Sequence, residues 1–223
     1  MVSFILIRHD YIRPWILRFK VFFILACCGV YPISAQNSFD KHIEASDIER
    51  IVINGNQIFS ISVSTHNSKN ITMRSTIDGE YQEEFQITNT KQNQILYLKL
   101  EQNPFMSIPD DKRNAHKVVA ASLNLVIPVN LDIDIKSDIG SVELTGNFKD
   151  ITVQLFTGFC KIQGQAKAAL INTVDGNIDI KTLNAEVIAN STYGSTEIET
   201  FPLKTTVWRL KSIYGNISVK KQE

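Results

Sequence analysis

Five glycines at a nearly constant interval constrain the fold of this chain more than any other feature. The first three intervals are 18 residues and the last is 21, with the surplus lying at residues 201–203. A unit this short cannot bury its own apolar face, so a repeat of this length predicts small structural units that stack on one another. The glycines are Gly140, Gly158, Gly176, Gly194 and Gly215.

Aligning the repeats on these glycines shows a regular alternation of apolar and polar residues. The positions seven and five before each glycine, and two and four after it, are apolar in every repeat except at Thr196. The positions between them are polar, as at Glu143, Lys161 and Asp179. Alternation with period two and one apolar face is typical of half-buried strands. Each repeat therefore reads as a strand, a glycine corner and a second strand.

This pattern predicts an all-β fold, specifically a single-stranded β-solenoid (β-helix) with repeats of about 18 residues. Equivalent residues of successive coils would then lie roughly 4.8 Å apart. The alternative is an antiparallel β-meander or prism in which each glycine marks a hairpin turn. Asp175-Gly176 suits such a turn, but the residues before the other four glycines do not. We favour the solenoid.

The part of the chain before the repeats is β-rich but less regular. Short alternating segments occur throughout residues 36–130, for example at 59–63 and 95–100, without a fixed period. No amphipathic helix is evident after the leader. We therefore expect residues 36–223 to form a single domain, irregular over 36–130 and regular over 131–220.

The N-terminal 35 residues have the layout of a secretory signal peptide. They carry four basic residues and one acidic residue, so their net charge is +3, and an apolar run over 21–31 precedes the small residues Ser34 and Ala35. We expect cleavage after Ala35. An uncleaved anchor, or a lipoprotein acylated at Cys27, is the alternative. The run is too short to span a membrane comfortably, so we expect no integral span after cleavage.

This leader predicts export of the protein to the periplasm, the outer-membrane surface or the medium. The remaining chain carries 19 basic and 22 acidic residues, a net charge of −3, which gives no reason to expect a nucleic-acid partner. It keeps one cysteine, Cys160, whose register with Val142 and Ile178 predicts burial. We see no metal-ligand spacing, nucleophile motif or phosphate loop, so we expect no metal and no cofactor.

The repeat motif resembles that of a known bacterial group. The segments 175–180 (DGNIDI) and 214–219 (YGNISV), together with an export leader ending in Ser34-Ala35-Gln36, are similar to the putative-adhesin β-strand-repeat domains. These domains are related to auto-transporter adhesin head domains and are frequent in envelope proteins of Bacteroidota-type bacteria. The resemblance implies a β-solenoid displayed in or on the cell envelope. It carries no catalytic residues.

Aromatic residues at the corners are the first candidate binding site. Tyr193 and Tyr214 both precede a repeat glycine, and Phe159 follows one. Exposed rings of this kind could contact the face of a sugar or a partner protein. The other reading is that they only cover the edge of the stack. An envelope protein or a glycan is the partner class that we expect.

Outward carboxylates are the second candidate site. If the coils stack in sequence order, Asp179 and Glu197 lie side by side, which would suit a carbohydrate-active β-helix enzyme. Lys161 stands between Glu143 and Asp179, however, so ordinary cross-strand charge pairing is the better reading. The same order would place Asn172 beside Asn190 as a short amide ladder. We favour a non-enzymatic envelope protein.

Overall fold

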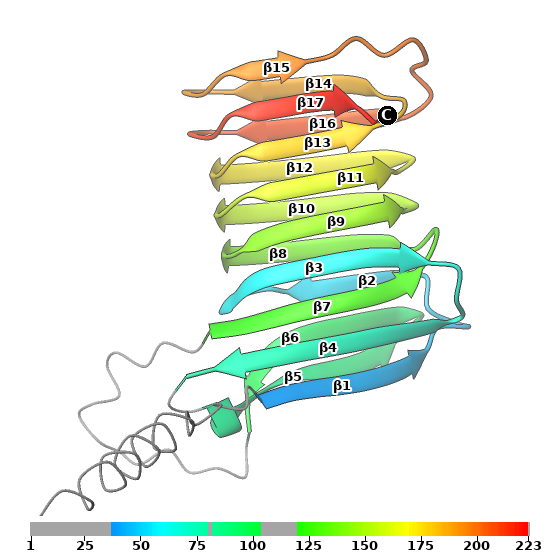
Figure 1. Cartoon of the computed structure of the whole chain (residues 1–223), viewed down its shortest axis with the longest axis vertical. Coiled ribbons are helices and arrows are strands. Elements are labelled where there is room, and N and C mark those ends of the chain that lie inside the picture. Colours follow the sequence, from blue (N-terminus) through cyan, green and yellow to red (C-terminus); the bar gives the residue numbers. More distant parts are fainter. Residues whose placement is uncertain (1–36, 80–81, 104–119, 223) are drawn as a thin grey trace, which may run out of the picture. The chain divides into compact units, whose positions relative to one another are not determined.

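The computed structural model describes residues 37–79, 82–103 and 120–222. Our expectations for residues 1–35, including Ala35 and Cys27, lie outside this part of the chain. The described residues form two β-sheets and one short 3₁₀ turn, η1 (Gln82–Glu84). The all-β class is therefore confirmed (Figure 1).

The larger sheet, sheet A, has nine described strands. In spatial order they are β1 (Asn37–Glu44), β4 (Asn70–Asp78), β7 (Ala120–Pro128), β3 (Ile58–His66), β9 (Ser141–Asn147), β11 (Cys160–Gln165), β13 (Ile178–Thr182), β17 (Ile217–Lys221) and β15 (Thr196–Ile198).

The smaller sheet, sheet B, has eight described strands. In spatial order they are β14 (Glu186–Ser191), β16 (Val207–Ser212), β12 (Ala168–Asp175), β10 (Asp150–Thr157), β8 (Asp132–Ile139), β2 (Arg50–Asn54), β6 (Ile95–Gln102) and β5 (Phe85–Gln92). Both sheets are mixed, because β1, β4 and β5 pair with their neighbours antiparallel.

Within the repeats, consecutive strands lie in different sheets and each strand pairs in parallel with its equivalent in another repeat. Residues 18 positions apart are paired, as in Ile133 with Ile151 and Ile151 with Ala169. Each glycine lies where the chain passes from sheet B to sheet A. We call one strand of sheet B and the strand of sheet A that follows it a coil. The parallel pairing excludes an antiparallel meander for the repeats.

The predicted apolar face is the core between the two sheets. Val142, Cys160 and Ile178 form one buried row across β9, β11 and β13. The predicted burial of Cys160 is confirmed. Burial, with a smaller contribution from Asp179, raises the pKa of the Cys160 thiol to about 12, so the thiol stays protonated.

The last two coils do not stack in sequence order. The coil β16–β17 lies between β12–β13 and β14–β15, so the corner glycines follow the spatial order Gly176, Gly215, Gly194 (Figure 1). Our expectation that Gly194 follows Gly176 in the stack is wrong. Burial gives the physical reason, since β16 contributes the fully buried Trp208, whereas β15 offers the polar Thr196 at an inward position.

A second glycine corner lies at the opposite edge of the sheets. Gly146 and Gly164 pair with each other and are also 18 residues apart. Our sequence analysis described only the first glycine series and missed this second one. A Cβ at Gly164 would overlap the carbonyl oxygen of Gly146, and its φ of +150° suits glycine. Small or apolar residues fill the turn behind this corner, namely Phe148, Ala166 and Ala185, all buried.

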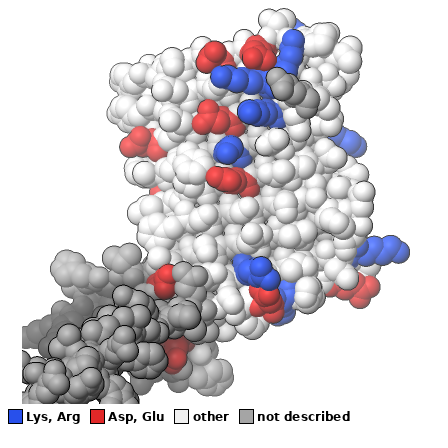
Figure 2. Space-filling model, viewed as in Figure 1, with Lys and Arg blue, Asp and Glu red and all other residues white. Residues whose placement is uncertain are grey.

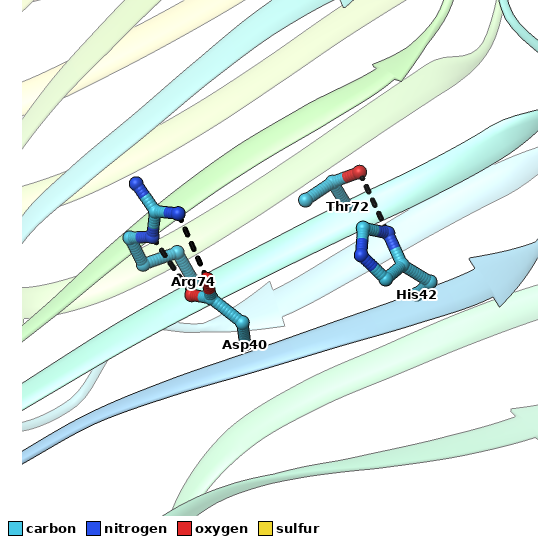
Figure 3. A network of polar contacts seen from close by, with 4 residues as sticks. All are labelled: Asp40, His42, Thr72 and Arg74. Carbon is cyan, nitrogen blue, oxygen red and sulfur yellow. Dashed lines mark hydrogen bonds and ion pairs between the residues drawn. The ribbon is translucent and has the colours of Figure 1, made fainter.

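The first half of the chain supplies strands to the same stack. β2 pairs in parallel with β8, and β3 with β9, so the coil β2–β3 lies directly beside the first repeat. At the far edge of sheet A, Arg74 donates hydrogen bonds of 2.7 and 2.8 Å to the carboxylate of Asp40, and His42 lies 3.2 Å from Thr72 Oγ1 (Figure 3). The bond from Arg74 is the main reason that the pKa of Asp40 is lowered.

Candidate binding surface

Hydroxyl groups hold the backbone of the glycine corner in place. Ser212 Oγ accepts a hydrogen bond from the Gly215 N–H (2.8 Å) and donates one to the Gly176 carbonyl (3.2 Å). Ser191 does the same for the neighbouring coil, accepting from Gly194 (2.9 Å) and donating to Gly215 (2.7 Å). Backbone groups that leave the sheets at the turn are therefore satisfied. The corner is a well-defined support for the side chains beside it.

Tyr193 and Tyr214 stack on each other at this corner. Their ring centroids are 5.1 Å apart with an interplanar angle of 11°. The residues are 72% and 61% exposed, respectively. The prediction that the two rings lie side by side is confirmed. Their coils are adjacent in the stack, although the order of these two coils is the reverse of the sequence order. Because the rings are stacked, their inner faces cover each other, and their edges and outer faces offer apolar area to a partner.

Phe159 is exposed at the same edge of the sheets, with the Gly176 coil between it and Tyr214, and the structure adds residues that our sequence analysis missed. Phe159 is exposed on the sheet A side of Gly158, and Phe156 is exposed on the sheet B side. Ile139, immediately before Gly140, is exposed as well, and so is Phe59 at the start of β3. An inspection of two residues on either side of every glycine would have found Phe156 and Ile139. We call Tyr193, Tyr214, Phe159, Phe156 and Ile139 the corner surface.

The carboxylates proposed as an enzymatic pair are not neighbours. Asp179 pairs with Ser218, and Ser218 pairs with Glu197 on its other side. The expectation that Asp179 and Glu197 lie side by side is wrong, because the inserted strand β17 separates them. They are two strands apart, roughly 10 Å at the usual strand spacing. They therefore do not form the side-by-side pair, with carboxyl groups about 5–5.5 Å apart, that a retaining glycosidase uses.

The predicted position of Lys161 between two carboxylates on sheet A is confirmed. Lys161 pairs in register with Glu143 on one side and Asp179 on the other. Figure 2 shows acidic and basic side chains alternating over the upper strands of this face, with a broad uncharged area below them. A shallow groove of about 580 Å³ runs beside these residues. Its lining includes the carboxylates Glu143 and Asp179 and three lysines, and two of these lysines, Lys181 and Lys220, pair in register with each other.

The predicted amide ladder is also displaced by the inserted coil. Asn172 and Asn190 both pair with Lys211, which lies between them, so they do not stack. A ladder does form one residue after the corner glycines. Asn177 Oδ1 accepts from the Asn216 N–H (2.8 Å), and Asn216 Oδ1 accepts from the Ser195 N–H (2.8 Å). These bonds tie neighbouring coils together at the corner.

Within residues 37–79, 82–103 and 120–222, no group of three or more His, Cys, Asp or Glu side chains is arranged to hold a metal ion. In the same part of the chain, no helix is long and apolar enough to cross a membrane.

The chain matches several solved structures of bacterial proteins over most of its length. The chain resembles a putative cell adhesion protein from Clostridium sporogenes with 14% identity and a TM-score of 0.59, over 84% of this chain and all of that one. It also matches a putative adhesin from Bacteroides fragilis (15% identity, TM-score 0.45, 86% and 100% covered). A putative lipid binding protein from Parabacteroides distasonis matches with 12% identity and a TM-score of 0.30, over 84% and 97%.

The match to the Clostridium protein confirms, for the fold, the resemblance that the repeat motif indicated. At 14% identity the Clostridium likeness concerns the fold alone. No protein-family model and no curated protein sequence matches the chain.

Proposed function

We propose that this chain is an exported cell-envelope protein that binds a partner without catalysis, through the corner surface of a β-solenoid. The observation that carries the proposal is the exposed stack of Tyr193 and Tyr214. Each exposed ring leaves apolar area in contact with water. Covering this area with a partner would stabilise the complex by about 25 cal/mol per Å² of apolar area buried. Rings that are held rigidly together yet kept out of the core are typical of contact surfaces.

The pairing of the strands supports the solenoid. Strands of the repeats alternate between sheets A and B, and equivalent residues 18 positions apart are paired in parallel. Successive coils thus place equivalent side chains in rows, so a short motif becomes an extended surface. The Clostridium protein of similar fold is named a putative cell adhesion protein, which fits a surface role.

The compartment follows from the leader. We propose that residues 1–35 are removed by cleavage after Ala35 and that the domain acts in the periplasm, on the outer-membrane surface or outside the cell. Mass spectrometry of the mature protein tests this, and a chain that starts at Gln36 supports it. An acylated N-terminal Cys27 would instead show a lipoprotein.

The corner surface is tested by removing its two tyrosines. We expect the variant with Tyr193→Ala and Tyr214→Ala to lose most of its binding to envelope extract or to a glycan array, with little change in melting temperature. The matched control is Tyr97→Ala, because Tyr97 is an exposed tyrosine on β6, away from the corner. Binding by the double variant that equals that of the Tyr97 control would refute the proposal.

A further inference from the structure

A groove on the outer face of sheet B combines a polar row with an apolar row. It has a volume of about 460 Å³ and lies across β8, β10, β12 and β16, on the sheet B side of the glycine corner. The parallel register sets its architecture, because equivalent side chains from four strands fall into line. We call it the sheet B groove.

The polar row contains two amides between two lysines. Lys136 pairs in register with Gln154, Gln154 with Asn172, and Asn172 with Lys211. At the usual strand spacing the row is roughly 14 Å long from the first Cα to the last, about the length of two to three sugar rings. Amide and ammonium groups supply the donors and acceptors that a row of sugar hydroxyls requires.

An apolar row lies two residues further along the chain from Gln154, Asn172 and Lys211, whereas the equivalent position on β8 is the acidic Asp138. Phe156 is 60% exposed, and Val174 and Ile213 are half-buried beside it. A sugar ring has an apolar C–H face and polar hydroxyl edges, so an apolar row parallel to a polar row matches both. Binding sites for small molecules commonly pair an apolar lining with a few placed polar groups in this way.

The two ends of the groove differ in charge. Lys136 has acidic residues two positions away on both sides of its own strand, Asp134 and Asp138. Lys211 lies between Asn172 and Asn190 across the strands. The residues two positions from Lys211 along the chain are Arg209 on β16 and Ile213 just after its end.

The positive charge of Lys136 is therefore locally compensated. The charge of Lys211 is reinforced by that of Arg209. The unbalanced end is consequently the one on β16, where an anionic group would be attracted.

We propose that the sheet B groove binds a carboxylate-bearing oligosaccharide, with a ring against Phe156 and the carboxylate at Lys211. The inference rests on the proposed function only in that it assumes an exported protein acting by binding. It adds a ligand class and a second surface, since only Phe156 is shared with the corner surface. Arg209 reinforces the attraction of the carboxylate.

Titration of the full-length protein with trigalacturonic acid, and with the neutral galactose trisaccharide, tests this ligand class by calorimetry or NMR. We expect the acidic sugar to bind at least fivefold more tightly than the neutral one, with an advantage that shrinks as salt is added. Lys211→Gln should remove this advantage, whereas Phe156→Ala should weaken both sugars. Equal affinity for the two sugars would overturn the proposal.

The matched control is Lys161→Gln on sheet A, where the lysine lies between two carboxylates. It should bind trigalacturonic acid as the unmodified protein does. If it loses as much affinity as Lys211→Gln does, net charge rather than the groove explains the binding, and the proposal fails. An unchanged affinity for Lys211→Gln sinks it as well.

The corner variant separates this inference from the proposed function. If Tyr193→Ala with Tyr214→Ala leaves envelope binding intact while Lys211→Gln abolishes the preference for the acidic sugar, the corner proposal fails and the groove stands. Loss of envelope binding in the tyrosine variant, with no preference for the acidic sugar in the unmodified protein, refutes the groove alone.

Discussion

The central coils and the final two coils are built from the same sequence motif but obey different stacking rules. From β8 to β13 each coil lies on the one that precedes it in sequence. After β13 the order is reversed, because β16–β17 enters between β12–β13 and β14–β15. The loop between β15 and β16, residues 199–206, lets the chain return to the inner place.

The size of the inward side chains explains which coil takes the inner place. Trp208 and Leu210 on β16 align with the smaller Val187 and Ala189 on β14, so placing β16–β17 inside buries more apolar area.

The exposure of the two coils reflects this arrangement. Ile180 on β13 is 2% exposed and Val219 on β17 is 0% exposed, whereas the equivalent Ile198 on β15 is 41% exposed. β15 also carries Glu197, and Glu199 follows directly. The more apolar coil is covered on both sides and the more acidic one forms the end, where charged edges discourage further strand pairing. Position in the stack thus follows apolar content rather than sequence order.

Disulfide crosslinking between strands tests the order of the final two coils, because a bond forms only between neighbouring strands. Because Asp179 pairs with Ser218, a variant with cysteines at 179 and 218 should form the bond readily on mild oxidation. A variant with cysteines at 179 and 197 should remain reduced, since Cα atoms two strands apart exceed the roughly 7 Å limit of a disulfide. Free-thiol titration and mass spectrometry of peptide pairs measure the outcome. A bond between 179 and 197 would restore the sequence order that we reject.

The largest effect on stability should come from a charge placed in the core. Ile178→Asp buries an unpaired carboxylate between coils and should lower the free energy of unfolding by about 3 kcal/mol or more. Ile198→Asp, in the exposed end coil, should cost about 1 kcal/mol or less. Denaturant unfolding of both variants checks this, with Asp179→Asn as a nearly silent control. Similar losses for Ile178→Asp and Ile198→Asp would mean that the end coil is as buried as the centre.

A smaller effect is expected from the corner hydroxyls. Ser212→Ala leaves the buried Gly215 N–H without its acceptor and should cost about 1–2 kcal/mol. Ser195→Ala removes only an exposed hydroxyl, and the backbone N–H of residue 195 still donates to Asn216. The free energy of unfolding should therefore fall by about 0.5 kcal/mol or less. Thermal unfolding of the two variants decides. A Ser212 variant as stable as the Ser195 variant would show that water replaces the hydroxyl at this corner.

The smallest effect lies at the opposite end of the stack and depends on pH. Arg74 lowers the pKa of Asp40 in the folded state, so this pair stabilises the protein above the ordinary value of 3.8 and the contribution is lost as pH falls through the lowered pKa. The melting temperatures of the unmodified protein and of Asp40→Asn should therefore differ slightly at neutral pH and converge as the pH falls through the lowered pKa of Asp40. A constant difference across the titration would show that the pair has no effect.

Much of the repeat architecture could be predicted because it depends on local pattern. The period, the inward face and the corner positions all follow from alternation around Gly140, Gly158 and Gly176. The same rules placed Cys160 in the core and Tyr193 beside Tyr214. Gly146 and Gly164 could have been found as well, since they repeat the same interval. Phe156 was missed because the candidate binding residues were taken from positions directly next to a glycine, and Phe156 lies two residues before Gly158.

The sequence by itself determined which residues face inward, where the chain turns and which residues align between repeats, since alternation and glycine act over a few residues. Only the tertiary structure decided which coil lies next to which. Coils that share one motif have the same local conformational preferences. Which coil takes the inner place therefore depends on the total apolar area that the stack buries. That choice separated Asp179 from Glu197 and set Lys211 between two asparagines. The candidate sites therefore changed although the repeat did not.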